Sequence, residues 1–230
     1  MTINKQLIQA VQNNNLILVK DLIKQGADID AKKNESLRTA TRNGYLEIAE
    51  YLIEQGADIY FDNNYALRIS AYRGNLKLVD YLISKKADIH AENDNALNLS
   101  AHRGHLEIVK YLVERGANIH SNNDYSLRVA AENGHLEVVK YLVEKGTDIY
   151  ANNDEALIWA SKNNHLEIIK YFLFDCQMKV KEETKNRLIE NNKKECLYLI
   201  EERDSILKNY QNLEKLKINS VNNCHKKVKI

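Results

Sequence analysis

Glycine recurs in this chain with a period of 30 along the sequence, and this repeat constrains the fold more than any other feature. The eight glycines fall into two columns, one of Gly26, Gly56, Gly116 and Gly146 and one of Gly44, Gly74, Gly104 and Gly134. Between the columns, as at residues 105–116, apolar residues follow the spacing of an amphipathic helix. Glycine just past a helix end supplies the left-handed residue that satisfies the last carbonyls. The repeat therefore predicts helices that end at glycines.

A second, shorter helix completes each unit. It carries a leucine column followed three residues later by small residues, which let neighbouring helices approach closely. The leucines are Leu7, Leu37, Leu67, Leu97, Leu127 and Leu157. Asn-Asn or Asn-Asp pairs such as Asn63-Asn64 and Asn93-Asp94 precede these helices, and we expect them to supply turns and N-cap acceptors. One helix pair cannot bury its apolar face alone, so the units are predicted to stack into a solenoid.

Four positions in the columns are not glycine. Asn14 and Asn164 stand at the two ends of the second column, and asparagine tolerates the left-handed conformation best after glycine. Lys86 and Cys176 interrupt the first column. We expect Lys86 to cost roughly 1 kcal/mol if it keeps a positive φ, and we interpret Cys176 as the place where the pattern fades.

Composition excludes several classes of protein. Eight glycines and no proline, against about 16 and about 12 at average usage, argue against a turn-rich all-β fold. The 33 basic and 32 acidic residues nearly cancel, so no global field favours nucleic acid or an anionic membrane. Three cysteines in the last quarter indicate a reducing compartment. With no leader, no myristoylation site and no apolar run of about 18 residues, we expect a soluble, intracellular, cytoplasmic protein.

Residues 104–120, and again residues 134–148, resemble the second helix and hairpin of an ankyrin repeat. The resemblance covers about residues 1–174 and implies an all-α, ankyrin-type solenoid of helix-turn-helix repeats with short β-turn fingers and a concave binding face. Ankyrin units usually have 33 residues and open with Thr-Pro-Leu-His, whereas this unit has 30 and lacks that Pro and His. The fingers should therefore be shorter. Short, Asn-rich, proline-free units resemble the ankyrin families of giant DNA viruses.

We assign residues 1–203 to the repeat domain and residues 204–230 to a short helix with a disordered basic tail. Residues 1–30 form an N-terminal capping repeat and residues 179–203 a degenerate C-terminal cap. The internal repeats are 31–60, 61–90, 91–120, 121–150 and 151–178. The charge is uneven, because residues 175–230 carry 13 Lys/Arg against 9 Asp/Glu.

The sequence does not indicate catalysis, a cofactor, a metal or a small-molecule substrate. Histidines in one column lie one repeat apart, on the order of 10 Å, which is too far to share a zinc ion. No phosphate loop, nucleophile elbow or zinc-protease motif occurs. A tyrosine column could form a stacking ladder for bases, but we interpret its rings as packed between second helices with surface hydroxyls. This column is Tyr51, Tyr81, Tyr111, Tyr141 and Tyr171.

Repeat scaffolds bind through side chains that vary between units on the concave face, and Tyr and Arg are typical of interface hot spots. The candidate partner-binding residues are Phe61, Tyr65, Arg68, Tyr72, Arg73, Asn98, His102, Arg103, Tyr125 and Arg128. Alternatively, Arg38, Arg68 and Arg128 only pair with neighbouring acids such as Glu35. If the patch is functional, replacing Tyr65 and Arg68 by alanine should abolish capture and leave the fold intact.

These observations predict a monomeric, non-catalytic scaffold that binds a protein partner on its concave face, in a host cytoplasm if the protein is viral. The mixture of Arg, Tyr and acids suits a protein segment with acidic and aromatic side chains. Two alternatives remain open. The chain could be a ubiquitin-ligase adaptor acting through residues 179–216, or a nucleic-acid accessory protein acting through its basic tail, which predicts salt-sensitive retention on nucleic acid.

Overall fold

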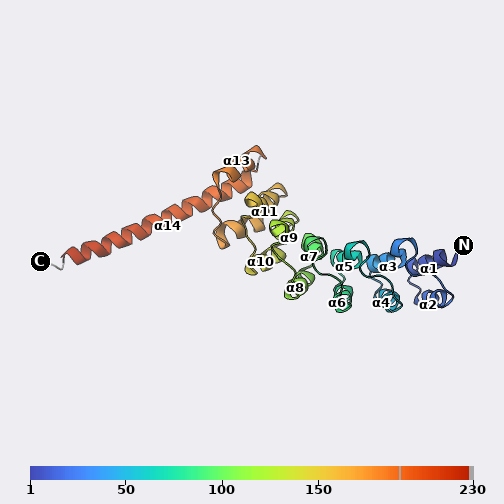
Figure 1. Cartoon of the computed structure of the whole chain (residues 1–230). Coiled ribbons are helices and arrows are strands. Elements are labelled where there is room, and N and C mark those ends of the chain that lie inside the picture. The colour runs from blue at the N-terminus through green and yellow to red at the C-terminus, as the bar shows by residue number, and fades with distance from the viewer. Residues whose placement is uncertain (192, 228–230) are drawn as a thin grey trace.

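A computed structural model of the chain describes residues 1–191 and 193–227, with side chains described through residue 215. Helices alternate between two layers along the repeat domain (Figure 1). The first helix of each unit lies in one layer: α1 (Ile3–Gln12), α3 (Ala31–Asn43), α5 (Phe61–Arg73), α7 (Ala91–His102), α9 (Ser121–Glu132) and α11 (Ala151–Lys162). The second lies in the other: α2 (Leu16–Lys24), α4 (Leu46–Glu54), α6 (Leu76–Ser84), α8 (Leu106–Glu114), α10 (Leu136–Glu144) and α12 (Leu166–Lys170). The predicted all-α solenoid is confirmed.

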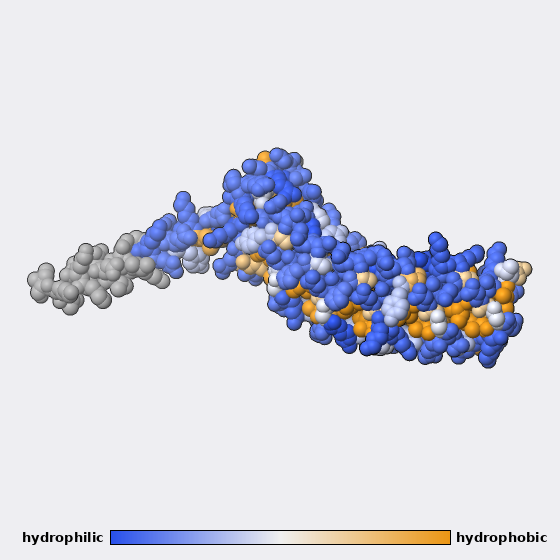
Figure 2. Space-filling view, viewed as in Figure 1, coloured by the Kyte–Doolittle hydropathy of each residue, from blue (hydrophilic) through white to orange (hydrophobic). Residues whose placement is uncertain are grey.

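The core lies between the two layers. The leucine column from Leu7 to Leu157 is fully buried, and each second helix adds residues such as Val79 and Leu82. Figure 2 shows apolar residues in a band where the layers meet, bordered by hydrophilic residues. First helices pack closely on one another, whereas second helices touch each other less. The small residues that follow each leucine permit this close packing, so the first helices form the inner side of the bend in Figure 1.

A left-handed turn opens each internal unit. Three consecutive residues at the start of α3, α5, α7, α9 and α11 have φ between +48° and +62°. In α5 these are Asp62, Asn63 and Asn64, and the right-handed helix follows them. Asn and Asp visit this conformation more easily than other side chains, which explains their repetition in the sequence. The predicted short fingers take the form of these turns, and the described residues contain no β-strand.

The side chains that end these turns were expected to cap the following helix, and this expectation was wrong. The Oδ1 atoms of Asn64 and Asp94 instead accept hydrogen bonds of 2.8 Å from the backbone N–H groups of Asp88 and Asn118, 24 residues further on. These backbone groups start the next finger along the chain. The turn side chains therefore connect successive fingers of the array.

Both glycine columns have positive φ, and so do their substitutes Asn14, Asn164 and Lys86. The second column also needs space. A Cβ atom built on Gly74 or Gly134 would lie 2.8 Å or 2.6 Å from the ring of the histidine that precedes the next second helix, His105 or His165. Around Gly116, in the first column, nothing lies within 4 Å of such an atom. The second column is therefore glycine for packing as well as for backbone conformation.

The last second helix has one extra residue. It changes after Lys170 into a π-helical segment, η1 (Tyr171–Asp175). Just beyond this segment, the N–H of Met178 donates to the carbonyl of Phe172. In the preceding unit the equivalent bond runs from Thr147 to Leu142, one residue shorter. The left-handed residue is consequently Gln177, with φ of 51°, while Cys176 is right-handed. The inserted residue shifts the register by one position, so the alignment of Cys176 with the glycine column was wrong.

Two further helices follow, α13 (Glu182–Glu190) and α14 (Lys194–Lys227). The first turns of α14 pack on α12 and η1, and the rest projects away from the repeats (Figure 1). A short helix and a disordered tail were expected over residues 204–230, and the structure corrects this through residue 227. No glycine or proline interrupts residues 194–227, so the helix continues from the cap. Residues 228–230 lie outside the described residues.

Candidate partner-binding face

Arginines on the first helices close the left-handed turns that open them. The Nε atoms of Arg38, Arg68 and Arg128 donate to the backbone carbonyls of Lys33, Asn63 and Asn123, each five residues earlier, at 3.0–3.2 Å. Asn98 occupies the same column, and its amide donates to the Asn93 carbonyl at 3.1 Å. These side chains therefore stabilise the turns, which is a structural role for three of the candidate binding residues, Arg68, Asn98 and Arg128.

The same arginines form ion pairs with the next repeat. Arg38 lies 2.8 Å from Asp62, Arg68 lies 2.8 Å from Glu92, and Arg128 contacts Glu155. Glu35, the partner considered from the sequence, instead accepts a hydrogen bond from Thr39. Hydrogen bonds from Asn63 and Asn95, with the charge of Arg68, lower the pKa of Glu92. The pairs thus run between repeats, with acids that the sequence separates by 24 to 27 residues.

An aromatic cluster lies at the start of the row, between α3 and α5. The rings of Phe61 and Tyr65 are 5.7 Å apart, and the Arg38 guanidinium lies 4.9 Å and 4.5 Å from their centroids. Arg42 donates to the Tyr65 hydroxyl at 3.4 Å. Phe61 is buried and Tyr65 is half-buried, so Tyr65 is the aromatic residue that this cluster presents to solvent.

A second cluster joins α5 and α7. The Tyr72 and His102 rings stack at 6.2 Å with an interplanar angle of 28°, and the Arg103 guanidinium lies 5.0 Å from the Tyr72 centroid. Arg73 and Arg103 are exposed at the ends of their helices. His102 Nδ1 is buried without a hydrogen-bond partner among the described residues. This cluster combines one stacked ring pair with one accessible guanidinium group, that of Arg103.

The third cluster contains a residue that the sequence analysis missed. Tyr125 meets Trp159 edge to face at 6.4 Å, and the Arg128 guanidinium lies 5.1 Å and 5.3 Å from the two ring centroids. Trp159 is half-buried on α11. Its column also holds Thr39, Ile69, Leu99 and Val129. The signal that could have found it is the single tryptophan of the chain at a position that varies between repeats.

Seven of the ten candidate residues, all except Arg68, Arg73 and Asn98, thus fall into three successive clusters along one layer of helices and do not form a single pocket. A family model for ankyrin repeats (3 copies) matches residues 5–63, 40–123, 67–153 and 118–185, which together span well over half of the chain. The chain belongs to the ankyrin repeat family. No curated protein matches it. Ankyrin repeats are generally protein–protein interaction modules and typically non-enzymatic scaffolds.

The histidine column of this ankyrin domain has a structural use. The Nε2 atoms of His105, His135 and His165 lie 2.9–3.1 Å from backbone carbonyls of the preceding repeat, 33 residues earlier. Burial lowers the pKa of His135. Within the described residues, no three His, Cys, Asp or Glu side chains are grouped to hold a metal ion, and no helix is long and apolar enough to cross a bilayer.

The tyrosine column packs between the second helices, as expected, but its hydroxyls are not simply at the surface. Tyr81 donates to the Glu50 carbonyl and Tyr111 to Asp80, while the Tyr141 hydroxyl is buried with no partner among the described residues. Burial and the Asp80 hydrogen bond raise the pKa of Tyr111 to about 12. The Arg115 guanidinium lies 3.4 Å from the centroid of the Tyr111 ring. Because a basic side chain covers that ring, this geometry does not favour a base-stacking ladder.

Proposed function

We propose that this ankyrin domain is a non-catalytic scaffold that holds one protein partner along its layer of first helices. The observation that carries the proposal is the repetition of an aromatic ring beside an arginine at three junctions, α3–α5, α5–α7 and α9–α11. Trp, Tyr and Arg are the residues in which binding energy concentrates at interfaces. The ring types change from junction to junction, whereas the leucine column that builds the core is the same in all six units.

The charges of the exposed side chains support an acidic partner segment. Arg42, Arg73 and Arg103 are exposed at the C-terminal ends of three successive first helices. A cation at the C-terminal end of a helix interacts favourably with the helix dipole and stabilises the helix by about 0.3–1 kcal/mol. The position of these arginines alone therefore has a structural explanation. Their alignment beside Tyr65 and Tyr72 favours a segment with both carboxylate and aromatic groups.

The test uses substitutions that spare the turns. Because Arg68 donates to the carbonyls of Asn63 and Asp62, replacing it would perturb the fold as well as the surface. We therefore choose Tyr72→Ala, Arg103→Ala and Tyr125→Ala together. Affinity purification with mass spectrometry identifies proteins that the native chain retains, and the triple variant should lose them while its circular dichroism spectrum still shows a folded helical protein.

A matched control removes exposed side chains from the other layer. Lys77 and Glu137 lie on the second helices α6 and α10, and both are exposed. A Lys77→Ala and Glu137→Ala variant should keep the partner. Retention of the same protein by the triple variant, or its loss from the control, would contradict the placement on the first helices.

We infer a viral origin and action in a host cytoplasm from the resemblance of the short, Asn-rich, proline-free units to ankyrin families of giant DNA viruses. The near balance of 33 basic and 32 acidic residues supports a partner other than nucleic acid or a membrane. Fluorescence microscopy of the tagged chain in a host cell should show cytoplasmic signal, and accumulation at nuclei or membranes would contradict this inference.

A further inference from the structure

The projecting part of α14 carries an apolar stripe that the repeats do not cover. In the first turns of α14, the part that we call its root, Cys196, Ile200 and Arg203 are buried against the domain. The same helix face continues through Ile206, Leu207, Tyr210 and Leu213, which are 37–65% exposed. The spacing of three and four residues keeps all of them on one side of the helix. The stripe is therefore a continuation of an established packing interface beyond the surface that buries it.

An apolar hollow of about 140 Å³ lies where α14 leaves the domain. Leu173 and Phe174 of η1 form one wall, and Ile206, Leu207 and Tyr210 of α14 form the other. Arg203 also lines it and is 5% exposed. Its Nη2 atom pairs with Asp204 at 3.0 Å, but its Nε atom has no hydrogen-bond partner among the described residues. A buried, unpaired donor is costly, so the hollow suits an apolar side chain accompanied by an acceptor.

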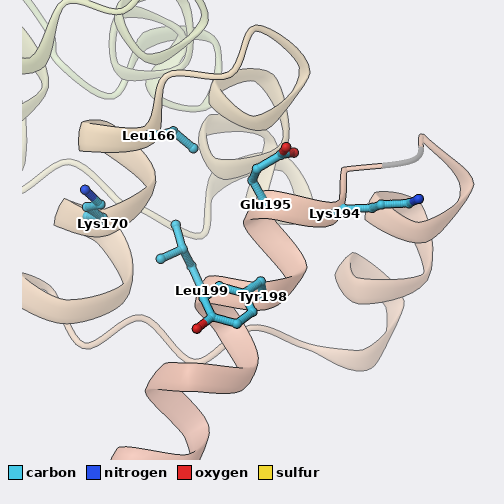
Figure 3. Close-up of a pocket in the computed structure, with 6 residues that line it drawn as sticks. All are labelled: Leu166, Lys170, Lys194, Glu195, Tyr198 and Leu199. Carbon is cyan, nitrogen blue, oxygen red and sulfur yellow. The ribbon is translucent and has the colours of Figure 1, made fainter.

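A second groove lies on the other side of the root, between α12 and α14. Leu166 and Lys170 face Tyr198 and Leu199 across it (Figure 3). The side chains that line it include both a lysine and a glutamate from the first turn of α14, Lys194 and Glu195. None of the described side chains that line this groove is a buried polar group without a hydrogen-bond partner, so nothing in it selects an occupant.

Charge along α14 is strongly asymmetric. Residues 194–204 contain two basic and four acidic residues, a net charge of −2, whereas residues 205–227 contain five basic and one acidic, a net charge of +4. Two copies of this helix side by side in opposite directions, with a two-fold axis near residue 208, would set residues 212–222, with a net charge of +1, beside residues 194–204, with a net charge of −2. Two copies in the same direction would set like charge against like charge, which is unfavourable.

We propose that the projecting part of α14 pairs antiparallel with α14 of a second copy of this chain. The two-fold axis lies near residue 208, so that Ile206 and Leu207 meet Tyr210 of the second copy. Leu213 of the second copy enters the hollow, and Glu214 of the second copy accepts from the buried Arg203. Most helical stability in proteins comes from packing of an amphipathic face, so mutual burial of the stripes stabilises the projecting helix. This inference is independent of the proposed function, since it uses no residue of the first-helix layer.

Sedimentation equilibrium of the full chain tests association. The native chain should show twice its 26.6 kDa mass, and Leu213→Lys should show a single copy, because a second cation cannot enter the hollow beside Arg203. Leu213 is 56% exposed, so the repeat domain of the variant should stay folded. Asn212→Lys places the same charge on the opposite side of α14 and should keep the dimer. A native monomer at about 100 µM, or a dimer of Leu213→Lys, would overturn the proposal.

Orientation is tested with a spin label on Cys224 in a Cys176→Ser background, since Cys196 is buried. Residue 224 lies 16 positions from the proposed axis, and the rise of about 1.5 Å per residue puts the two labels roughly 50 Å apart. Parallel helices would bring the labels within about 20 Å, which is two helix diameters. The longer of these two distances supports the antiparallel pair, and the shorter one excludes it.

Discussion

In the central repeats and at the C-terminal end of the array, a buried turn carboxylate and a finger N–H group both need hydrogen-bond partners, and the two regions supply different ones. In the centre, Asp94 accepts the N–H of Asn118 at the next finger and also lies 2.9 Å from His90. At the end, Asp154 takes the place of Asp94 but accepts from the Thr184 hydroxyl at 2.5 Å. The equivalent backbone group, the N–H of Lys179, donates to the Tyr150 hydroxyl at 3.0 Å.

The difference follows from the residue inserted in η1. It moves the last finger by one position, so the atoms that meet at each junction between central repeats no longer meet there. Asp154 is fully buried, and its Oδ1 has no partner among the described residues. At these equivalent positions, a carboxylate accepts from the finger N–H in the centre, whereas at the end a tyrosine hydroxyl accepts from it and one oxygen of Asp154 has no partner among the described residues.

We expect the largest effect from a substitution that disrupts the close approach between a glycine and the histidine of the next repeat. Gly134→Ala adds a Cβ atom 2.6 Å from the His165 ring at φ of +78° and should lower the free energy of unfolding by about 3 kcal/mol. Gly116→Ala is the matched control, because φ is +95° and nothing lies within 4 Å. It should cost only about 1 kcal/mol. Urea titration followed by circular dichroism measures both, and equal losses would show that the histidine contact is unimportant.

The next effect compares the two aspartates directly. Asp94→Ala leaves the Asn118 N–H unpaired and should lower the free energy of unfolding by about 1–3 kcal/mol. Asp154→Ala removes a buried carboxylate that accepts one hydrogen bond, so the free energy of unfolding should fall by less than in Asp94→Ala. Chemical denaturation of the two variants under identical conditions gives the comparison. A larger loss for Asp154→Ala would mean that the end of the array is as well satisfied as the centre.

The smallest effect concerns acidification of the central repeats. Burial lowers the pKa of His135 in the folded state, so the unfolded chain binds more protons there. The stabilisation by neutral His135 is complete above the unfolded pKa of about 6.5 and is lost as pH falls through the folded value. Unfolding midpoints between pH 7.5 and pH 5 should therefore fall less in His135→Gln than in the native chain. A steeper fall in the variant would contradict this assignment.

Much of the fold was predictable because it depends on local spacing. The leucine column, the two glycine columns and the asparagine substitutes at positions 14 and 164 all occupy the predicted conformations. The surface was harder to predict. Arg68 and Arg128 looked like binding residues, yet their guanidinium groups hold backbone carbonyls and acids of the next repeat. Such contacts depend on which groups the stacking brings together, and a single column does not show that.

The sequence by itself determined the repeat, the helical class and the positions that need a left-handed backbone, because periodicity and glycine chemistry act within one unit. Only the tertiary structure decided the partners of polar groups between units: the bond from Asp94 to Asn118, the contact of Gly134 with His165, and the unpaired Nε of Arg203. It also decided that residues 194–227 form one helix with an uncovered face. The physical reason is that hydrogen bonding and burial depend on distances across the stack, which spacing along the chain leaves open.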